Sequence, residues 1–168
     1  MARIAFIVDD LFEDSEFLEP LARVREAGHE AVVVGKEAGK EITGKKGAKT
    51  TVEKGSSEVS ADEFDAVVIP GGYSPDKVRT DENLVALTRQ VHDAGKPMAA
   101  ICHAPWVLAE ADVLRDRTVT SYHSIRTDLK NAGATWVDKS VVEDGNIITS
   151  RNPGDIPDFC DALLSRLS

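Results

Sequence analysis

Residues 97–106 read PMAAICHAPW, a short apolar run that stops at a cysteine and a histidine. Residues 96–102 have the length and composition of a buried strand, and residues 103–111 continue with the pattern of a helix. A strand that leads directly into a helix places Cys102 and His103 at its carboxyl end. Because ligands bind at that edge of an open parallel sheet, this turn is the first candidate site.

The rest of the chain repeats this alternation of apolar, β-branched runs with helical segments, which predicts an α/β fold with a mostly parallel sheet. In the first helix, Phe17, Leu18, Leu21 and Val24 are expected to form the apolar face. We find no repeat or linker, so residues 1–168 are predicted to form a single domain. The expected strands are 3–8, 30–35, 65–70, 96–102 and 118–122, and the expected helices are 15–27, 74–95, 103–111, 124–133 and 153–167. An exposed β segment or loop is expected at 41–55, and a hairpin with its turn at Asp144-Gly145 is expected near the C-terminus.

Composition narrows the partners and the compartment. The 168 residues are 42% hydrophobic and 29% charged, with a net charge of -9. Nucleic acid and anionic membrane surfaces are therefore not expected as partners, since both need a basic face. The first apolar run is too short for a signal peptide or membrane span, and two cysteines are too few for a disulfide framework. We expect a cytoplasmic protein, and the spacing of Cys, His and carboxylates indicates no metal site.

Three of the predicted strands end on polar or special residues that can converge on one pocket. The first leads to Glu13, the third to Gly71 and Gly72, and the fourth to Cys102. Near a helix N-terminus the Cys102 sulfur is expected to be ionised, and backbone N–H groups there and at Gly72 can hold an oxyanion. The pattern alone leaves a second interpretation open, in which Cys102 is a small hydrophobe in the core.

The neighbouring polar residues also have two interpretations each. His103 is either a general base or a solvent-facing residue at the start of a helix. Glu13 is either a protonated carboxyl that donates to the sulfur or a first-turn acid that stabilises its helix, and Asp76 has the same helix-stabilising alternative. Tyr122 either lines the rim of the pocket or belongs to a surface loop.

Five ordered segments carry a family resemblance: FEDSEF (12–17), FDAVVIPGG (64–72) with SPDKVR, GKPMAAICHAP (95–105), NAGATWVD (131–138) and VVEDGNIITSRNPGD (141–155). With these motifs the chain resembles the PfpI-type intracellular peptidase and general stress protein family. That family lies in the class I glutamine amidotransferase-like superfamily, which includes the Parkinsonism-associated deglycase. The resemblance covers nearly the whole chain.

The resemblance implies a flavodoxin-like three-layer sandwich with Cys102 as the nucleophile at a sharp elbow and His103 beside it. Glu13 would contact the sulfur, and Asp76 would reach His103 of another subunit in a homodimer or hexamer. The N–H groups of Gly72 and His103 would form the oxyanion hole, with no added cofactor.

The substrate-binding set expected from the motifs is Gly71, Gly72, Ala104 and Tyr122. Two departures from the family pattern bear on this pocket. Ala104 stands where a glycine usually follows Cys-His, and Asp76 is one methylene shorter than the common glutamate. Trp106, where the family often has a polar residue, would narrow the pocket.

The predicted activity is a cysteine-dependent stress-response hydrolase or lyase acting on glyoxal, methylglyoxal or their protein and nucleotide adducts. Two alternatives stay open, an intracellular peptidase for short peptides and a non-enzymatic redox sensor. A flavin or nucleotide module is discounted because residues 9–14 contain acids and no glycine-rich phosphate loop. A glutamine amidotransferase is discounted because no downstream His-x-Glu pair completes its triad.

Overall fold

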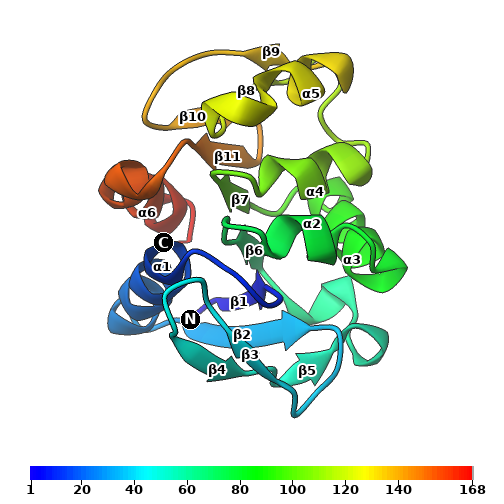
Figure 1. Cartoon of the computed structure of the whole chain (residues 1–168), viewed down its shortest axis with the longest axis vertical. Coiled ribbons are helices and arrows are strands. Elements are labelled where there is room, and N and C mark those ends of the chain that lie inside the picture. The colour runs from blue at the N-terminus through cyan, green and yellow to red at the C-terminus, as the bar shows by residue number, and fades with distance from the viewer. Residues whose placement is uncertain (168) are drawn as a thin grey trace.

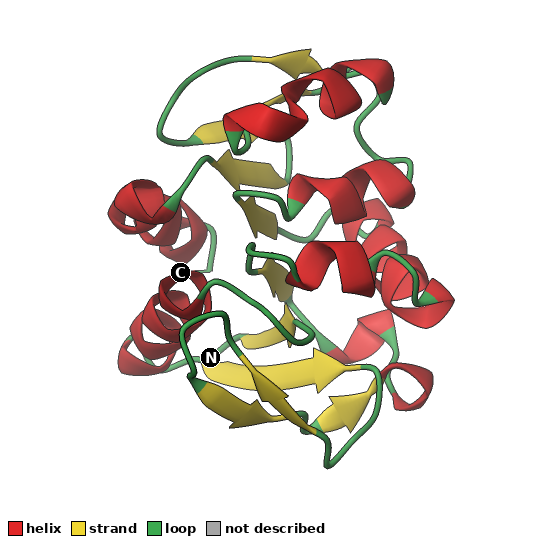
Figure 2. Cartoon of the chain, in the orientation of Figure 1, coloured by secondary structure: helices red, strands yellow, loops and turns green. Residues whose placement is uncertain are grey.

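A twisted central sheet with helices on both faces forms the body of the chain, as the computed structural model of residues 1–167 shows (Figures 1 and 2). Its strand order is β10-β11-β7-β6-β1-β2-β5, and every neighbouring pair is parallel except the β10–β11 hairpin. The α/β, flavodoxin-like fold is thereby confirmed. The strands are β1 (Arg3–Ile7), β2 (Glu30–Gly35), β5 (Lys54–Gly55), β6 (Ala66–Ile69), β7 (Met98–Ile101), β10 (Val142–Asp144) and β11 (Ile147–Ser150).

Two buried apolar clusters, one on each face of the sheet, hold the layers together. The first and last helices cover one face, and the helices of the middle of the chain cover the other (Figure 1). Strands β1, β6 and β7 are buried along their length, as expected for parallel strands covered on both sides. The helices are α1 (Asp14–Glu26), α2 (Ser74–Val78), α3 (Glu82–Asp93), α4 (Pro105–Glu110), α5 (Arg126–Asn131) and α6 (Ile156–Ser165).

Two predicted details differ from the structure. The buried positions of α1 include Glu16, Phe17 and Val24, whereas Leu18 is 44% exposed, so the predicted apolar face is rotated. The strand predicted at 118–122 is only β8 (Thr118–Val119), which pairs with β9 (Thr135–Trp136) in a separate two-stranded sheet. Thr120, which follows β8, is buried and its N–H donates to the Thr149 side chain instead of to a strand of the central sheet.

The predicted β excursion at 41–55 is a short hairpin, β3 (Glu41–Thr43) and β4 (Lys49–Thr51), followed by the edge strand β5. The loop between β3 and β4 lies against the start of α1, where Asp14 accepts hydrogen bonds from the backbone N–H groups of Lys46 and Ala48. This docking brings a lysine-rich loop to the carboxyl edge of the sheet.

Strand order reverses between β1 and β6, because β2 lies on one side of β1 and β6 with β7 on the other. In α/β sheets this reversal opens a crevice at the carboxyl ends of the strands. The residues that follow β1, β6 and β7 meet there. Within residues 1–167, no helix has the length and apolar character that a bilayer crossing requires.

Candidate active site

Cys102 directly follows β7 and has a left-handed backbone, with φ of 67°. A non-glycine residue in this region costs about 1–3 kcal/mol and persists only where the surroundings impose it. Here the Cys102 N–H donates to the Ser150 carbonyl (3.0 Å), and its own carbonyl accepts from the Tyr122 N–H (2.9 Å). The corner turns the side chain out of the strand, and the residue keeps 8% exposure.

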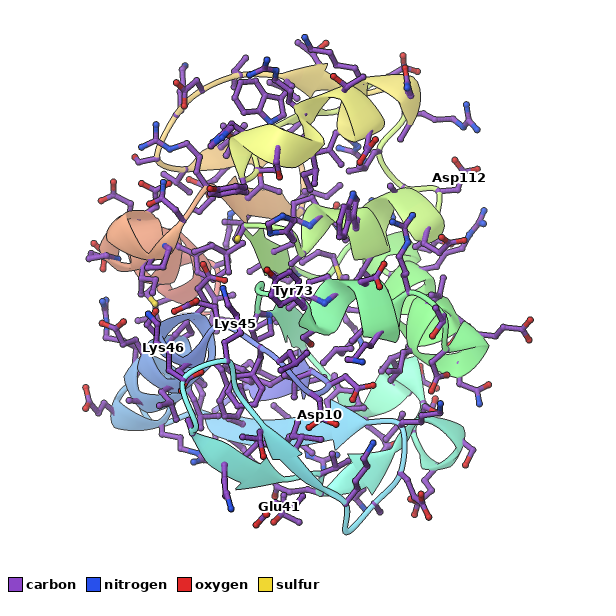
Figure 3. All side chains as sticks on the ribbon, viewed as in Figure 1. Asp10, Glu41, Lys45, Lys46, Tyr73 and Asp112 are labelled. Carbon is purple, nitrogen blue, oxygen red and sulfur yellow. The ribbon has the colours of Figure 1, made fainter. Side chains whose placement is uncertain are left out.

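The sulfur opens into a cavity of about 360 Å³. Loops after β1, β6 and β7 form its floor, and the β3–β4 loop contributes one lysine to its wall. Figure 3 shows Lys45 and Tyr73 next to each other, with Lys46 farther from Tyr73. The lining residues are Glu13, Glu16, Lys45, Gly72, Tyr73, Cys102, His103, Tyr122 and Pro153.

The His103 ring lies beside the sulfur, with 3.2 Å between Nδ1 and Sγ. On its other side Nε2 is 3.2 Å from the Ser124 hydroxyl, and the ring stacks on Tyr122 with centroids 5.1 Å apart. Burial, and then the charge of Lys45, lower the pKa of His103. The imidazole is therefore neutral at neutral pH and can accept the thiol proton.

The carboxyl group at the sulfur belongs to Glu16, which corrects the expectation for Glu13. Glu16 is fully buried and lines the cavity beside Cys102; its Oε1 accepts the Gly71 N–H at 2.9 Å, and its Oε2 has no hydrogen-bond partner among residues 1–167. Burial, reinforced by the charge of Glu13, raises the pKa of Glu16 to about 8. The Glu16 carboxyl is thus protonated at neutral pH and can donate to sulfur.

Glu13 lies at the cavity rim and pairs with lysines. Its Oε1 is 3.0 Å from Lys46 Nζ, and its Oε2 is 3.4 Å from Lys45 Nζ. Glu13 precedes the first turn of α1 and faces the β3–β4 loop, whereas Glu16 occupies the buried face three residues later. This offset of three residues, less than one helical turn, explains why the Glu16 carboxyl rather than that of Glu13 lies beside Cys102.

The surroundings of Cys102 favour the neutral thiol over the ionised sulfur expected from the sequence. Burial, followed by the charge of Glu16, raises the pKa of the Cys102 thiol to about 12, although the N–H groups of Gly72 and His103 and the charge of Lys45 act in the opposite direction. The charge of Glu16 raises the pKa of Cys102 only when the Glu16 carboxyl is ionised. Helix α4 has six residues and a weak dipole, so it does not offset burial. The nucleophile must be generated by proton transfer, for which His103 is in position.

Gly71 and Gly72 shape the pocket in different ways. The Gly71 N–H is already bound to Glu16, and a Cβ at Gly71 would overlap Glu16 Oε1 and lie 2.6 Å from Cys102 Cβ. Gly72 has φ of 81°, and a Cβ there would lie 2.6 Å from the Leu11 carbonyl oxygen. Since the Gly72 N–H is directed at the sulfur, Gly72 rather than Gly71 can serve an oxyanion.

The remaining predicted residues separate into those at the cavity and those outside it. Tyr122 lies in the wall, as expected. Ala104 is fully buried in the apolar core and does not line the cavity, because its side chain points under α4. Asp76 lies in a second cavity of about 320 Å³ with Asp9 and Lys40, so it does not approach His103 within its own chain.

Sequence reasoning missed Glu16, Lys45 and Ser124. An acid at a buried position of an amphipathic helix is a detectable signal for Glu16, because burying an unpaired carboxylate is costly. Lys45 and Ser124 are polar loop residues, and nothing local in the sequence places them at the site. Among residues 1–167 no cluster of three or more His, Cys, Asp or Glu has the geometry of a metal site.

The chain is similar to proteins of known class over nearly its whole length. A model of the DJ-1/PfpI family matches residues 2–166. "Protein/nucleic acid deglycase 2" of Escherichia coli is 48% identical over 94% of this chain and 92% of its own length, and "Deglycase PfpI" of Pyrococcus furiosus is 46% identical over 92% of each. A two-domain Anabaena variabilis structure with DJ-1/ThiJ/PfpI-like and ferritin-like domains superposes with a TM-score of 0.98 and 43% identity; this match covers 99% of the chain and 48% of that protein.

Proposed function

This chain belongs to the DJ-1/PfpI family, and from that premise we propose that it is a cysteine-dependent enzyme for small reactive carbonyls. The substrates are glyoxal, methylglyoxal or the adducts that they form with amines and thiols of proteins and nucleotides. The observation that supports this most directly is the Cys102 sulfur, 3.2 Å from a neutral imidazole in a small cavity. Four relatives with 46% or more identity are named deglycases.

The first step forms a bond between Cys102 Sγ and the aldehyde carbon. The carbonyl π bond breaks, its oxygen becomes an oxyanion held by the N–H groups of Gly72 and His103, and the thiol proton passes to His103 Nδ1. His103 then gives that proton to the oxyanion and is neutral again. When the substrate is a hemiaminal or hemithioacetal adduct, its carbon has no carbonyl π bond to break: the C–N or C–S bond breaks as the bond to Cys102 Sγ forms, and the thiol proton taken by His103 passes to the departing amine or thiol.

For methylglyoxal the hemithioacetal rearranges without an outside oxidant. A proton moves from C1 to C2 through His103, so that the aldehyde carbon is oxidised to a thioester while the ketone carbon is reduced to an alcohol. Water hydrolyses the thioester, which releases lactate and restores the Cys102 thiol. Throughout, the protonated Glu16 supports the sulfur without adding charge.

The cavity favours small carbonyls over general proteolysis. Its volume of about 360 Å³ lies near the lower end of typical small-molecule pockets, and a folded polypeptide does not fit into it. A redox-sensing role is less favoured because burial raises the pKa of the Cys102 thiol, and oxidation follows thiolate character.

We propose further that a second copy of the chain contributes Asp76. In residues 1–167 no carboxylate is hydrogen-bonded to His103, whose Nε2 meets a hydroxyl. Leu11 and Tyr73 are two of the few large apolar residues that are exposed, and both lie beside α2, which carries Asp76. Asp76→Asn alone should be inactive, and refolding it together with Cys102→Ser should restore part of the activity, because one of the mixed sites is intact. Full activity of Asp76→Asn alone, or no recovery in the mixed oligomers, would overturn the shared site.

The proposed enzyme activity is tested with Cys102→Ser, using Cys160→Ser as the matched control. Methylglyoxal consumption and lactate formation are measured together. We expect turnover to be lost in Cys102→Ser and kept in Cys160→Ser. Equal turnover by wild type and Cys102→Ser would exclude the mechanism.

A further inference from the structure

Two lysines of the β3–β4 loop and two carboxylates at the start of α1 meet at the rim of the cavity. Lys45 and Lys46, adjacent in the β3–β4 loop, each face a different oxygen of the same carboxylate, at 3.4 Å and 3.0 Å from Glu13. A second carboxylate, that of Asp14, accepts the backbone N–H groups of Lys46 and Ala48, and its charge acts on Lys46. The two lysines and two carboxylates therefore balance, and what matters to the cavity is which ammonium group faces it.

Lys45 is the lysine whose ammonium group faces the cavity. It lines the wall, its side chain is 36% exposed, and its Nζ lies 5.2 Å from the centre of the Tyr73 ring (Figure 3). An aromatic face holds an ammonium group in place without neutralising it. Lys46 has a 70% exposed side chain and does not line the cavity.

The other titratable groups of the wall do not cancel this charge at neutral pH. Glu16 is protonated because burial raises its pKa to about 8, and His103 is neutral because burial lowers its pKa. The charge of Lys45 acts on the sulfur, on Glu16 and on His103, which places it within electrostatic reach of the reacting atoms.

We propose that Lys45 is a binding site for a carboxylate on the substrate, so that carbonyl adducts with a free carboxylate are preferred over neutral ones. This inference rests on the proposed function for the carbonyl part of the ligand. A single ammonium group matches a carboxylate, whereas a phosphate with about −1.5 to −2 charge would remain partly unpaired beside Glu13. The site is local, since the whole chain has a net charge of -9 and repels anions at a distance.

A pair of alkylating agents tests the site without relying on turnover. Iodoacetate and iodoacetamide both transfer a carbon to the Cys102 thiolate with loss of iodide, and they differ in carboxylate against carboxamide. The ratio of their rates at Cys102, read by peptide mass spectrometry, reports anion binding. Any change in the pKa of Cys102 cancels, because both reagents consume the same thiolate.

We expect the rate ratio to fall about tenfold in Lys45→Met, which corresponds to one charge-assisted contact of about 1.4 kcal/mol. Lys46→Met is the matched control: it removes the same charge from the same carboxylate but lies outside the wall, so its ratio should stay near that of wild type. Lys45→Arg should keep most of the ratio. Raising the ionic strength to about 1 M should lower the wild-type ratio, because the Debye length falls to about 3 Å.

The carbonyl part is tested with methylglyoxal hemithioacetals of N-acetylcysteine and of N-acetylcysteinamide. The carboxylate form should have the lower KM in wild type, and Lys45→Met should remove that difference. An unchanged alkylation ratio in Lys45→Met, or an equal fall in Lys46→Met, would overturn the carboxylate site. If neither hemithioacetal is turned over while the alkylation ratio depends on Lys45, the proposed function fails and the anion site stands.

Discussion

The two cysteines of this chain are both buried in the same apolar cluster, yet their surroundings differ. Cys102 is 8% exposed and Cys160 1% exposed, and burial is the largest cause that raises the pKa of each thiol, to about 12 and about 11. Burial and acidity therefore do not distinguish a nucleophile from a core residue. The two sulfurs differ in what lies next to them. The Cys102 sulfur is next to a neutral imidazole, whereas Cys160 is on the buried face of α6.

The backbone separates the two residues as well. Cys160 lies within a regular helix, whose backbone conformation a side chain adopts without strain. Cys102 sits in a left-handed corner between β7 and α4, a conformation that a side chain adopts only at a cost. The strain aims the sulfur at the cavity, which is consistent with a functional site.

The largest expected effect is the difference in thiol reactivity. In the native protein, iodoacetamide should alkylate Cys102 at least about 100 times faster than Cys160, because Cys160 reacts only after local unfolding. Peptide mass spectrometry over a time course measures both rates. In denaturant the two should react alike. Equal rates in the native state would remove the distinction between the cysteines.

Gly71→Ala should disturb the Cys102 region without touching Cys160. The new Cβ overlaps the Glu16 carboxyl and approaches Cys102, an overpacking that costs about 1–3 kcal/mol. Carbonyl turnover should fall by roughly 5- to 150-fold if the same energy is lost from the transition state. Gly28→Ala is the control, since Gly28 has φ of 88° but open space around it. Similar turnover in both variants would mean that the overlap with Glu16 and Cys102 does not disturb the site.

The sequence was sufficient to predict the central sheet and the position of Cys102 and His103. Strands β1, β2, β6 and β7 are dense runs of apolar residues whose burial does not depend on distant contacts. The predicted turn at Asp144-Gly145 is present between β10 and β11.

The errors have one physical origin, which is that side-chain direction depends on tertiary packing. Glu13 and Glu16 are separated by less than one helical turn, and only the rotation of α1 on the sheet decides which faces the sulfur. Ala104 follows the motif yet points into the core. Lys45 reaches the cavity through the docking of a hairpin loop, a long-range contact that has no local pattern.

Glu16→Gln should change how the Cys102 region responds to pH. The Glu16 carboxyl loses its proton near pH 4.5 when unfolded and near pH 8 when folded, so the folded state binds more protons between these values. The free energy of unfolding of wild type should therefore fall relative to Glu16→Gln as pH rises from about 4.5 to about 8, and then level off. Chemical denaturation at several pH values measures this difference.

The same variant should alter thiol reactivity at alkaline pH. Above about pH 8 the wild-type Glu16 carboxylate opposes ionisation of Cys102. The rate at which iodoacetamide alkylates Cys102 should therefore rise less steeply with pH above this value than below it. Glu16→Gln should lack this flattening, and the rate at Cys160 should be the same in both proteins. A flattening that persists in Glu16→Gln would assign it to another group.

The smallest effect tests whether the tautomer of His103 contributes to the difference between the cysteines. To accept the thiol proton, Nδ1 must be unprotonated, so Nε2 carries the hydrogen and donates it to the Ser124 hydroxyl. Ser124→Ala removes that acceptor and should lower kcat/KM about fivefold, for a hydrogen bond of about 1 kcal/mol. Ser124→Thr keeps a hydroxyl and should recover most of the rate. Ser140→Ala, which removes a hydrogen bond to Asp158 outside the cavity, should have no effect. If Ser124→Ala is as active as Ser140→Ala, the imidazole is oriented by its stacking on Tyr122 alone.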